Sequence, residues 1–153
     1  MTKKNKLTHI DQSGNSRMVD VLSKPMVKRI ALAEGFIKLS PESLRVIEEG
    51  LGHKGDVLSV AQLAGIMGSK KTGELIPLCH PIPIDSVEVV LELSEDGVHI
   101  RSTVGTVWKT GVEMEALTAI SVAALTVYDM LKAIDKHMVI EQIRLLEKVK
   151  IPL

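Results

Sequence analysis

The chain has 153 residues, with 19 basic and 19 acidic side chains, which suits a single domain. Its balanced charge and its aromatic share of 2% disfavour a nucleic-acid binder, which would show a basic excess and stacking rings. The single cysteine, Cys79, excludes an intrachain disulfide and an all-cysteine zinc site. It also favours a reducing compartment, most simply the cytoplasm.

Residues 1–15 are polar and contain Gly, Ser and Asn, so we expect a flexible N-terminal arm followed by one domain over 16–153. The start of the chain has no apolar core typical of a signal peptide. No stretch reaches the roughly 18 uninterrupted apolar residues of a membrane span, so no membrane partner is expected. The positive mean hydropathy favours extra apolar surface in a subunit interface, with a dense core as the alternative.

Residues 29–39 alternate with period two and predict a strand, with Ile30, Leu32 and Phe36 on one face. Ser40 and Pro41 then predict the start of a short helix over 41–49, which stops at a glycine.

A second helix is expected over 57–69. Asp56 can cap it, and Ser59 with Gln62 offers a capping box a little later. The cations Lys70 and Lys71 suit its C-terminal end.

The segment 75–84 contains three prolines and predicts a rigid, extended stretch outside any sheet ladder. Alternation over 86–93 and 98–107, around an Asp-Gly turn, predicts a β-hairpin. The spacing of Thr110 and Glu113 predicts a capping box at the start of a long, buried helix that continues to about Ile134. Residues 138–150 fit a strand or a helix, and their β-branched start favours a strand. Together these elements predict an α+β, ferredoxin-like sandwich, with an antiparallel sheet of about four strands packed against two or three helices.

Two loop segments carry candidate binding groups. Lys54, ahead of a helix N-terminus, suits a phosphate or carboxylate, although a solvated loop lysine is the plainer interpretation. His80, held between prolines, is typical of a preorganised hydrogen-bond donor or proton carrier. Its neighbour Cys79 points the opposite way in an extended chain, so the two cannot easily share a metal. A buried cysteine beside a satisfied histidine is an equally good local interpretation.

The long helix carries charged residues in an otherwise apolar sequence. A place in the capping box is a sufficient structural reason for an acid at Glu113. Glu115 has no such structural reason. Asp129 and Lys132 lie three residues apart, hence on one face, and Lys136 follows just beyond the helix end. A surface ion pair is the plain interpretation, but an apolar helix would partly desolvate the pair and shift its pKa values.

The whole set of motifs resembles one known family, from Met18 to Lys148. The resemblance is carried by KGDV (54–57), AGIMGSKKTGELIPLCHPIPI (64–84), KTGVEMEALTAISVAALTVYDMLKAIDKHMVI (109–140) and RLLEK (144–148). This pattern is similar to the molybdenum-cofactor biosynthesis protein C family, the cyclic pyranopterin monophosphate synthases. The resemblance implies a ferredoxin-like subunit and a homohexamer built as a trimer of dimers, with active sites at a subunit interface. It implies conversion of 3′,8-cyclo-7,8-dihydro-GTP to cyclic pyranopterin monophosphate with release of pyrophosphate, in molybdenum cofactor biosynthesis.

The same resemblance implies roles for particular residues. Asp129 and Lys132 match a catalytic acid/base pair, and Lys54 a catalytic or phosphate-contacting lysine. Arg29 and Lys70 match triphosphate contacts, with Lys136 a weaker addition. The substrate-binding positions are matched by Leu78, Cys79, His80, Glu113, Met114 and Glu115. No cofactor is expected to be required and no protein metal site is expected, although magnesium carried by the triphosphate is compatible with these residues.

The chain departs from the family pattern at two points: Val27 stands where the family usually has Thr, and the C-terminus KVKIPL lacks a Gly-Gly-Lys-rich tail. Two rival functions stay open. One is a catalytically silent nucleotide-binding module, which would have no need of an Asp/Lys proton-transfer pair. The other is a metal hydrolase that uses Cys79, His80 and His137.

The spacing of the candidates makes a geometric prediction. Glu113 and Asp129 lie 16 residues apart on one expected helix, which separates their backbones by roughly 24 Å. A nucleotide-sized substrate cannot comfortably span that gap. We therefore expect that no single subunit holds a complete site.

Overall fold

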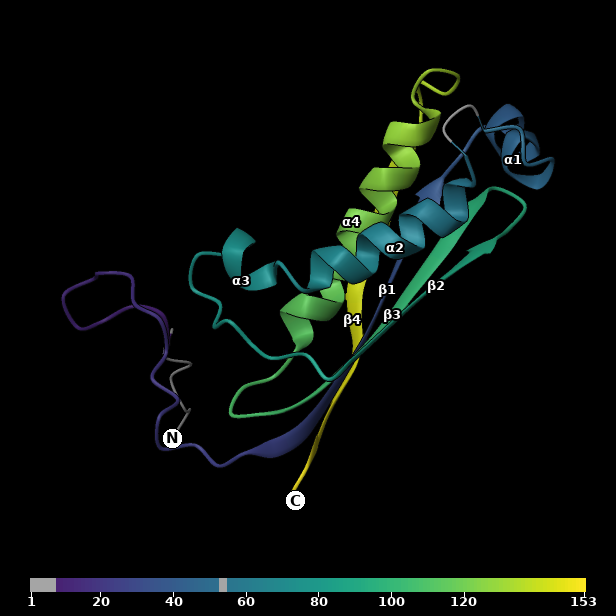
Figure 1. Ribbon diagram of the computed structural model, residues 1–153. Helices are drawn as coiled ribbons and strands as arrows, with labels where there is room; N and C mark the ends of the chain where they lie inside the picture. The colour runs from purple at the N-terminus through teal and green to yellow at the C-terminus, as the bar shows by residue number, and fades with distance from the viewer. Residues whose placement is uncertain (1–7, 53–54) are drawn as a thin grey trace, which may run out of the picture.

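The computed structural model describes residues 8–52 and 55–153. Its strands and helices follow one another in the order βαααββαβ along the chain, as Figure 1 shows. Their bounds are β1 (Val27–Lys38), α1 (Pro41–Glu48), α2 (Val57–Ser69), α3 (Thr72–Leu75), β2 (Ser86–Leu93), β3 (Gly97–Trp108), α4 (Glu113–Leu131) and β4 (Val139–Ile151).

The strands form one antiparallel sheet in the order β2-β3-β1-β4. With the two short helices α1 and α3 set aside, the connectivity is β-α-β-β-α-β, the ferredoxin-like arrangement. Figure 1 shows α2 and α4 lying together over one face of this sheet. The predicted α+β sandwich is confirmed, and the C-terminal segment is a strand.

The alternation of β1 decides which of its side chains enter the core. Ala31, Ala33 and Ile37 face the helices and are fully or almost fully buried. Ile30 and Leu32 alternate with them, so they lie on the opposite face of the sheet, where they are half-buried. The residues expected on one face of β1 therefore do share a face, but it is the face that the described helices leave uncovered.

Two of the expected helix caps form as predicted. The side chain of Ser40 accepts a hydrogen bond from Ser43 N at the start of α1. That of Asp56 accepts bonds from the backbone of Leu58 and Ser59 at the start of α2. These bonds satisfy N–H groups that have no partner inside the helix.

Both expected capping boxes are wrong. Ser59 Oγ donates to Asp56, and Gln62 reaches across to the carbonyl of Val89 at 2.8 Å. Helix α4 begins at Glu113 with Val112 as its N-cap residue and without a side-chain cap bond. It ends at Leu131, three residues earlier than expected, and the short helix α3 was not expected at all.

Glycines set the close contact between α2 and α4. A Cβ on Gly65 would lie 2.9 Å from the carbonyl oxygen of Ala119, and one on Gly68 would lie 2.7 Å from the Val122 side chain. These glycines therefore allow the two helices to approach closely rather than simply weakening the end of α2.

In the described part of the chain, α4 alone is long and apolar enough to span a membrane by length and composition. Half of its most apolar stretch is buried, against the sheet and α2. This is the pattern of a buried core helix, whose composition passes the same test.

Candidate functional site

Helix α4 separates the candidate residues into two groups. Glu113, Met114 and Glu115 lie in its first turn, whereas Asp129 and Lys132 lie at its C-terminal end. The helix is continuous over 19 residues, so the two groups are roughly 24 Å apart along its axis. The expected separation is therefore present within the chain.

A cavity of about 420 Å³ lies beside the first turn of α4 and brings together most of the expected substrate-binding residues. The extended segment after α3 contributes three of them and α4 the others. We call this cavity the His80 pocket; it is lined by Thr8, His9, Val19, Val21, Lys24, Leu78, Cys79, His80, Ile82, Thr110, Gly111, Glu113, Met114 and Glu115. Its size suits a small molecule.

Glu115 is the buried carboxyl of the site, with 3% of its surface exposed. Its Oε2 atom has no hydrogen-bond partner among the described residues. Burial raises the pKa of Glu115 to about 7; its own backbone N–H partly offsets this, and the charge of Glu113 adds to it. A carboxyl that titrates near neutral pH can both accept and release a proton.

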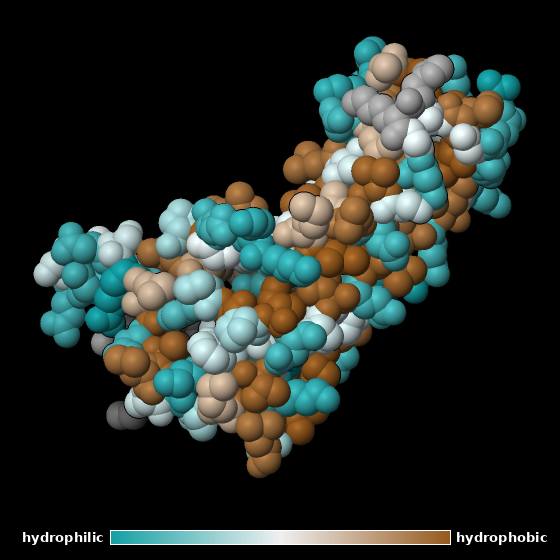
Figure 2. Space-filling model, viewed as in Figure 1, coloured by the Kyte–Doolittle hydropathy of each residue, from teal (hydrophilic) through white to brown (hydrophobic). Residues whose placement is uncertain are grey.

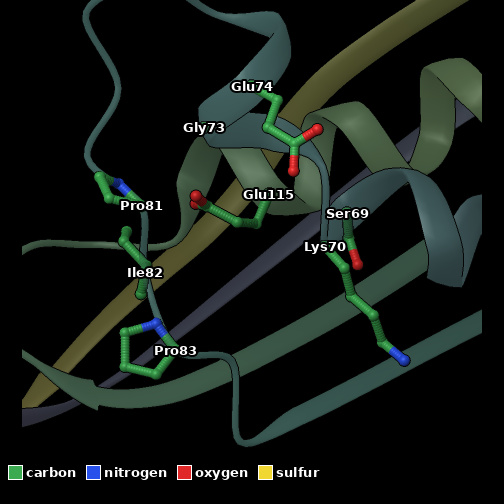
Figure 3. A pocket seen from close by; sticks show the side chains of 8 residues that line it. All are labelled: Ser69, Lys70, Gly73, Glu74, Pro81, Ile82, Pro83 and Glu115. Carbon is green, nitrogen blue, oxygen red and sulfur yellow. The ribbon is translucent and has the colours of Figure 1, made fainter.

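Glu115 also borders a second cavity of about 260 Å³, which is lined by the C-terminal end of α2, helix α3 and residues 81–83 of the proline segment. Figure 3 shows its carboxyl pointing toward Gly73 and Pro81, whereas the Lys70 side chain extends away from it. The structure therefore places Lys70 on the wall of this second cavity, not in the His80 pocket.

Cys79 and His80 differ in their chemistry. Burial raises the pKa of the Cys79 thiol, and the charge of Glu115 adds to the effect, so the thiol stays protonated and is a poor nucleophile. The Nε2 atom of His80 lies 2.7 Å from the carbonyl oxygen of Val19. Because a carbonyl can only accept, this contact requires the proton of the ring on Nε2.

Glu113 does not cap α4, contrary to the sequence interpretation. Its carboxylate pairs instead with Lys148 of β4 at 3.2 Å. The pair borders a cavity of about 260 Å³ that Arg29 also lines. The guanidinium of Arg29 donates to the carbonyls of Trp108 and Lys109, at 3.4 and 3.1 Å, which orients it near the start of β1.

Asp129 and Lys132 form the expected pair, with their charged atoms 2.7 Å apart. Their side chains are 55% and 58% exposed, so the expected desolvation is absent in the single chain. The hydrogen bond from Lys132 to Asp129, and then the charge of Asp129, raise the pKa of Lys132. The pair lines an open hollow of about 450 Å³ together with Lys136, whose Nζ donates to the carbonyl of Lys132 at 2.6 Å.

Asp135 ties this end of α4 to helix α1. Its carboxylate accepts bonds from Ser40 N at 2.7 Å, His137 N at 3.0 Å and Ser43 Oγ at 3.2 Å. Burial alone would raise the pKa of Asp135, but these hydrogen bonds outweigh it and lower the value. The turn that follows Lys132 is thereby fixed.

The remaining expectations divide as follows. Lys54 lies outside the described residues. Among the described residues, no three His, Cys, Asp or Glu side chains cluster as metal ligands. His137 follows the C-terminal end of α4, whereas Cys79 and His80 lie beside its first turn, so these three cannot form one metal site.

Sequence reasoning missed some of the residues around these cavities. Val19 and Lys24 line the His80 pocket, and Lys148 pairs with Glu113. Lys148 lies in a quoted motif and Val19 within the span of the resemblance, but a spacing argument could not assign either residue a contact. Lys24 carried no signal beyond its charge.

The fold and these cavities define a ferredoxin-like α+β protein with a small-molecule pocket beside its second long helix. Comparison of the sequence with family models matches residues 18–150 to the MoaC family, so the chain belongs to the MoaC family. The chain is 56% identical to the cyclic pyranopterin monophosphate synthase of Thermomicrobium roseum, over 93% of this chain and 87% of that protein. It is 58% identical to the protein of that name from Cereibacter sphaeroides, over 93% and 91% of the two chains. For cyclic pyranopterin monophosphate synthase 1 of Mycobacterium bovis, the identity is 54% over 93% and 84%.

Proposed function

We propose that the protein is a cyclic pyranopterin monophosphate synthase, a lyase of molybdenum cofactor biosynthesis. It converts 3′,8-cyclo-7,8-dihydro-GTP to cyclic pyranopterin monophosphate and releases pyrophosphate. The observation that carries this proposal is the identity of 54–58% to proteins of that name, over more than nine-tenths of the chain.

The geometry supports proton-transfer chemistry at both ends of α4. Ring rearrangement of a cyclised purine needs groups that accept and return protons. Glu115, with its pKa of about 7, and the Asp129–Lys132 pair provide such groups. The presence of this pair favours the enzyme over a catalytically silent nucleotide-binding module, because binding alone needs no proton carrier.

Arg29, Lys70 and Lys54 are proposed as triphosphate contacts, and Lys136 as a weaker one. Cations around the phosphates would stabilise the charge that develops as pyrophosphate leaves. We propose that the reaction needs no cofactor beyond magnesium carried by the triphosphate itself. A chelator titration tests this part: full activity in excess chelator would show that magnesium is not needed.

A homohexamer built as a trimer of dimers would complete the site. The two groups of residues lie at opposite ends of α4, too far apart for one nucleotide, so a neighbouring chain would supply one of them. Asp129 and Lys132, exposed in the single chain, would then be desolvated by that neighbour.

Apolar surface supports such an assembly. Val60, Leu63 and Met67 form a stripe along α2 and are 42–59% exposed. Figure 2 shows apolar side chains at the surface of this helical face. The opposite face of the sheet, with the half-buried Ile30 and Leu32, is a second surface that the described helices leave uncovered. Two separate apolar faces fit a closed assembly with two kinds of contact. As a biosynthetic enzyme acting on a small molecule, the protein is proposed to be cytoplasmic.

Incubation with enzymatically made cyclised GTP tests the function directly. The wild-type protein should form cyclic pyranopterin monophosphate and pyrophosphate, detected by mass spectrometry and by a coupled phosphate assay. Lys132→Ala should lose at least about 99% of the rate, as expected when a general acid/base is removed. Lys38→Ala, an exposed lysine at the end of β1, is the matched control. Tight binding of the substrate with no product from the wild type would favour the silent binding module.

A further inference from the structure

The described segment ahead of β1, residues 8–26, is tied to the candidate site. We call this whole segment the arm; it extends beyond the flexible arm that the sequence predicts over 1–15. Figure 1 shows this segment beside the extended loop that follows α3. Two hydrogen bonds hold it there: Val19 O accepts from His80, at 2.7 Å, and Leu22 O accepts from Lys109 Nζ, at 2.9 Å. One of these bonds is made to a residue of the His80 pocket itself. The arm therefore forms a wall of that pocket rather than lying free in solvent.

Lys24 is the cation that the arm brings to this wall. No described residue forms an ion pair or a side-chain hydrogen bond with its ammonium group. The two acids that line the pocket do not pair with the Lys24 ammonium. Glu113 pairs with Lys148, and Glu115 is buried in the first turn of α4. An unpaired ammonium at the edge of a 420 Å³ cavity is suited to an anionic part of the ligand.

We propose that residues 19–24 are part of the substrate site, in which Lys24 binds a phosphate of the triphosphate and the Val19 carbonyl holds His80 in the form protonated on Nε2. This inference rests on the proposed function for the identity of the substrate. It adds to that function a phosphate contact and a positioning group from a segment outside the ferredoxin-like core.

The Val19 contact has a chemical consequence for His80. With the proton of a neutral ring on Nε2, Nδ1 carries the lone pair and is the nitrogen free to accept a proton. The arm thus selects which nitrogen of His80 can act toward a ligand.

The test compares Lys24→Ala with Arg17→Ala, a basic residue of the same arm that does not line the pocket. Steady-state kinetics with cyclised GTP give KM and kcat, and calorimetry gives the affinity for inorganic tripolyphosphate. We expect Lys24→Ala to raise KM and to weaken tripolyphosphate binding by about tenfold each, as for one charge-assisted contact. The value of kcat should stay within about twofold, and Arg17→Ala should change none of these quantities. Nitrogen NMR of His80 in the wild type should show the proton on Nε2.

Unchanged KM and tripolyphosphate affinity in Lys24→Ala would overturn the phosphate contact, as would an equal effect in Arg17→Ala. A His80 ring protonated only on Nδ1 would overturn the positioning part. If the wild type forms no product, the proposed function fails, and tripolyphosphate binding still decides the role of Lys24 separately.

Discussion

The environment of each carboxylate separates the acids of this protein into two kinds. Glu115 is buried without a partner for Oε2, and its pKa is raised to about 7. Asp135 is equally buried but accepts three hydrogen bonds, and its pKa is lowered. A buried carboxyl without hydrogen-bond partners destabilises the fold. Such groups, with their shifted pKa values, are typical of functional sites. Asp135 serves to fix a turn, and Glu115 is available for proton transfer.

Glu115 should make the stability of the protein depend on pH. Its folded pKa, about 7, lies above its ordinary value of 4.5, so the folded state binds the extra proton. The contribution of Glu115 to stability is therefore complete below about pH 4.5 and is lost as the pH rises to about 7. Glu115→Gln removes this dependence. Urea unfolding at several pH values should show the free energy of wild type relative to the variant falling by about 2–3 kcal/mol over that range. A difference that is flat with pH would contradict a buried, raised Glu115.

The sequence could predict several residue-level features, because the physics behind them is local. The caps at Ser40 and Asp56 follow from residue type next to an apolar helix, and the Asp129–Lys132 pair follows from helical spacing. The capping box at Glu113 was wrong because Lys148, distant in the sequence, competes for that carboxylate. A long-range partner leaves no trace in a local pattern.

At the scale of elements, α2 and α4 form a single unit that carries the site. Gly65 and Gly68 let α2 lie close against α4, and the Ser102 hydroxyl of β3 donates to Ala116 O at 2.8 Å beneath the first turn of α4. This packing fixes the direction in which Glu115 projects. Periodicity predicted both helices but not their close contact. A glycine inside a helical pattern is compatible both with a less stable helix and with close approach of a neighbouring element.

Gly65→Ala tests this packing, because helix propensity and steric contact would change the free energy of unfolding in opposite directions. Propensity alone would stabilise an α-helix by about 1 kcal/mol. The new Cβ would lie 2.9 Å from the Ala119 carbonyl oxygen, which belongs to the backbone and cannot easily move. We expect a net loss of about 1–3 kcal/mol in the free energy of unfolding. Gly68→Ala should destabilise the protein as well, because its Cβ would lie 2.7–3.1 Å from the Cβ and both methyl groups of Val122, a stiff β-branched side chain. A rise in Tm for Gly65→Ala would contradict the close contact.

For the whole molecule, the central feature is the distance between the two ends of α4. The His80 pocket, with its wall of arm residues, lies at the first turn, and the Asp129–Lys132 pair lies at the last. The count of residues along one helix predicted this separation from sequence. The place of the arm could not be predicted, because an irregular segment has no periodicity to indicate which surface it contacts. One nucleotide can contact both groups only if a second chain places the C-terminal end of its α4 beside the His80 pocket of the first chain.

Complementation in mixed oligomers tests the shared site most directly. Asp129→Asn and His80→Ala should each be inactive alone, because each removes a group from one end of α4. After the two variant chains exchange subunits, some interfaces would combine a wild-type His80 with a wild-type Asp129 from another chain. The account predicts that conversion of cyclised GTP returns to a measurable part of the wild-type rate. No recovery, with subunit exchange verified by native mass spectrometry, would place both groups of one site on the same chain and contradict the account.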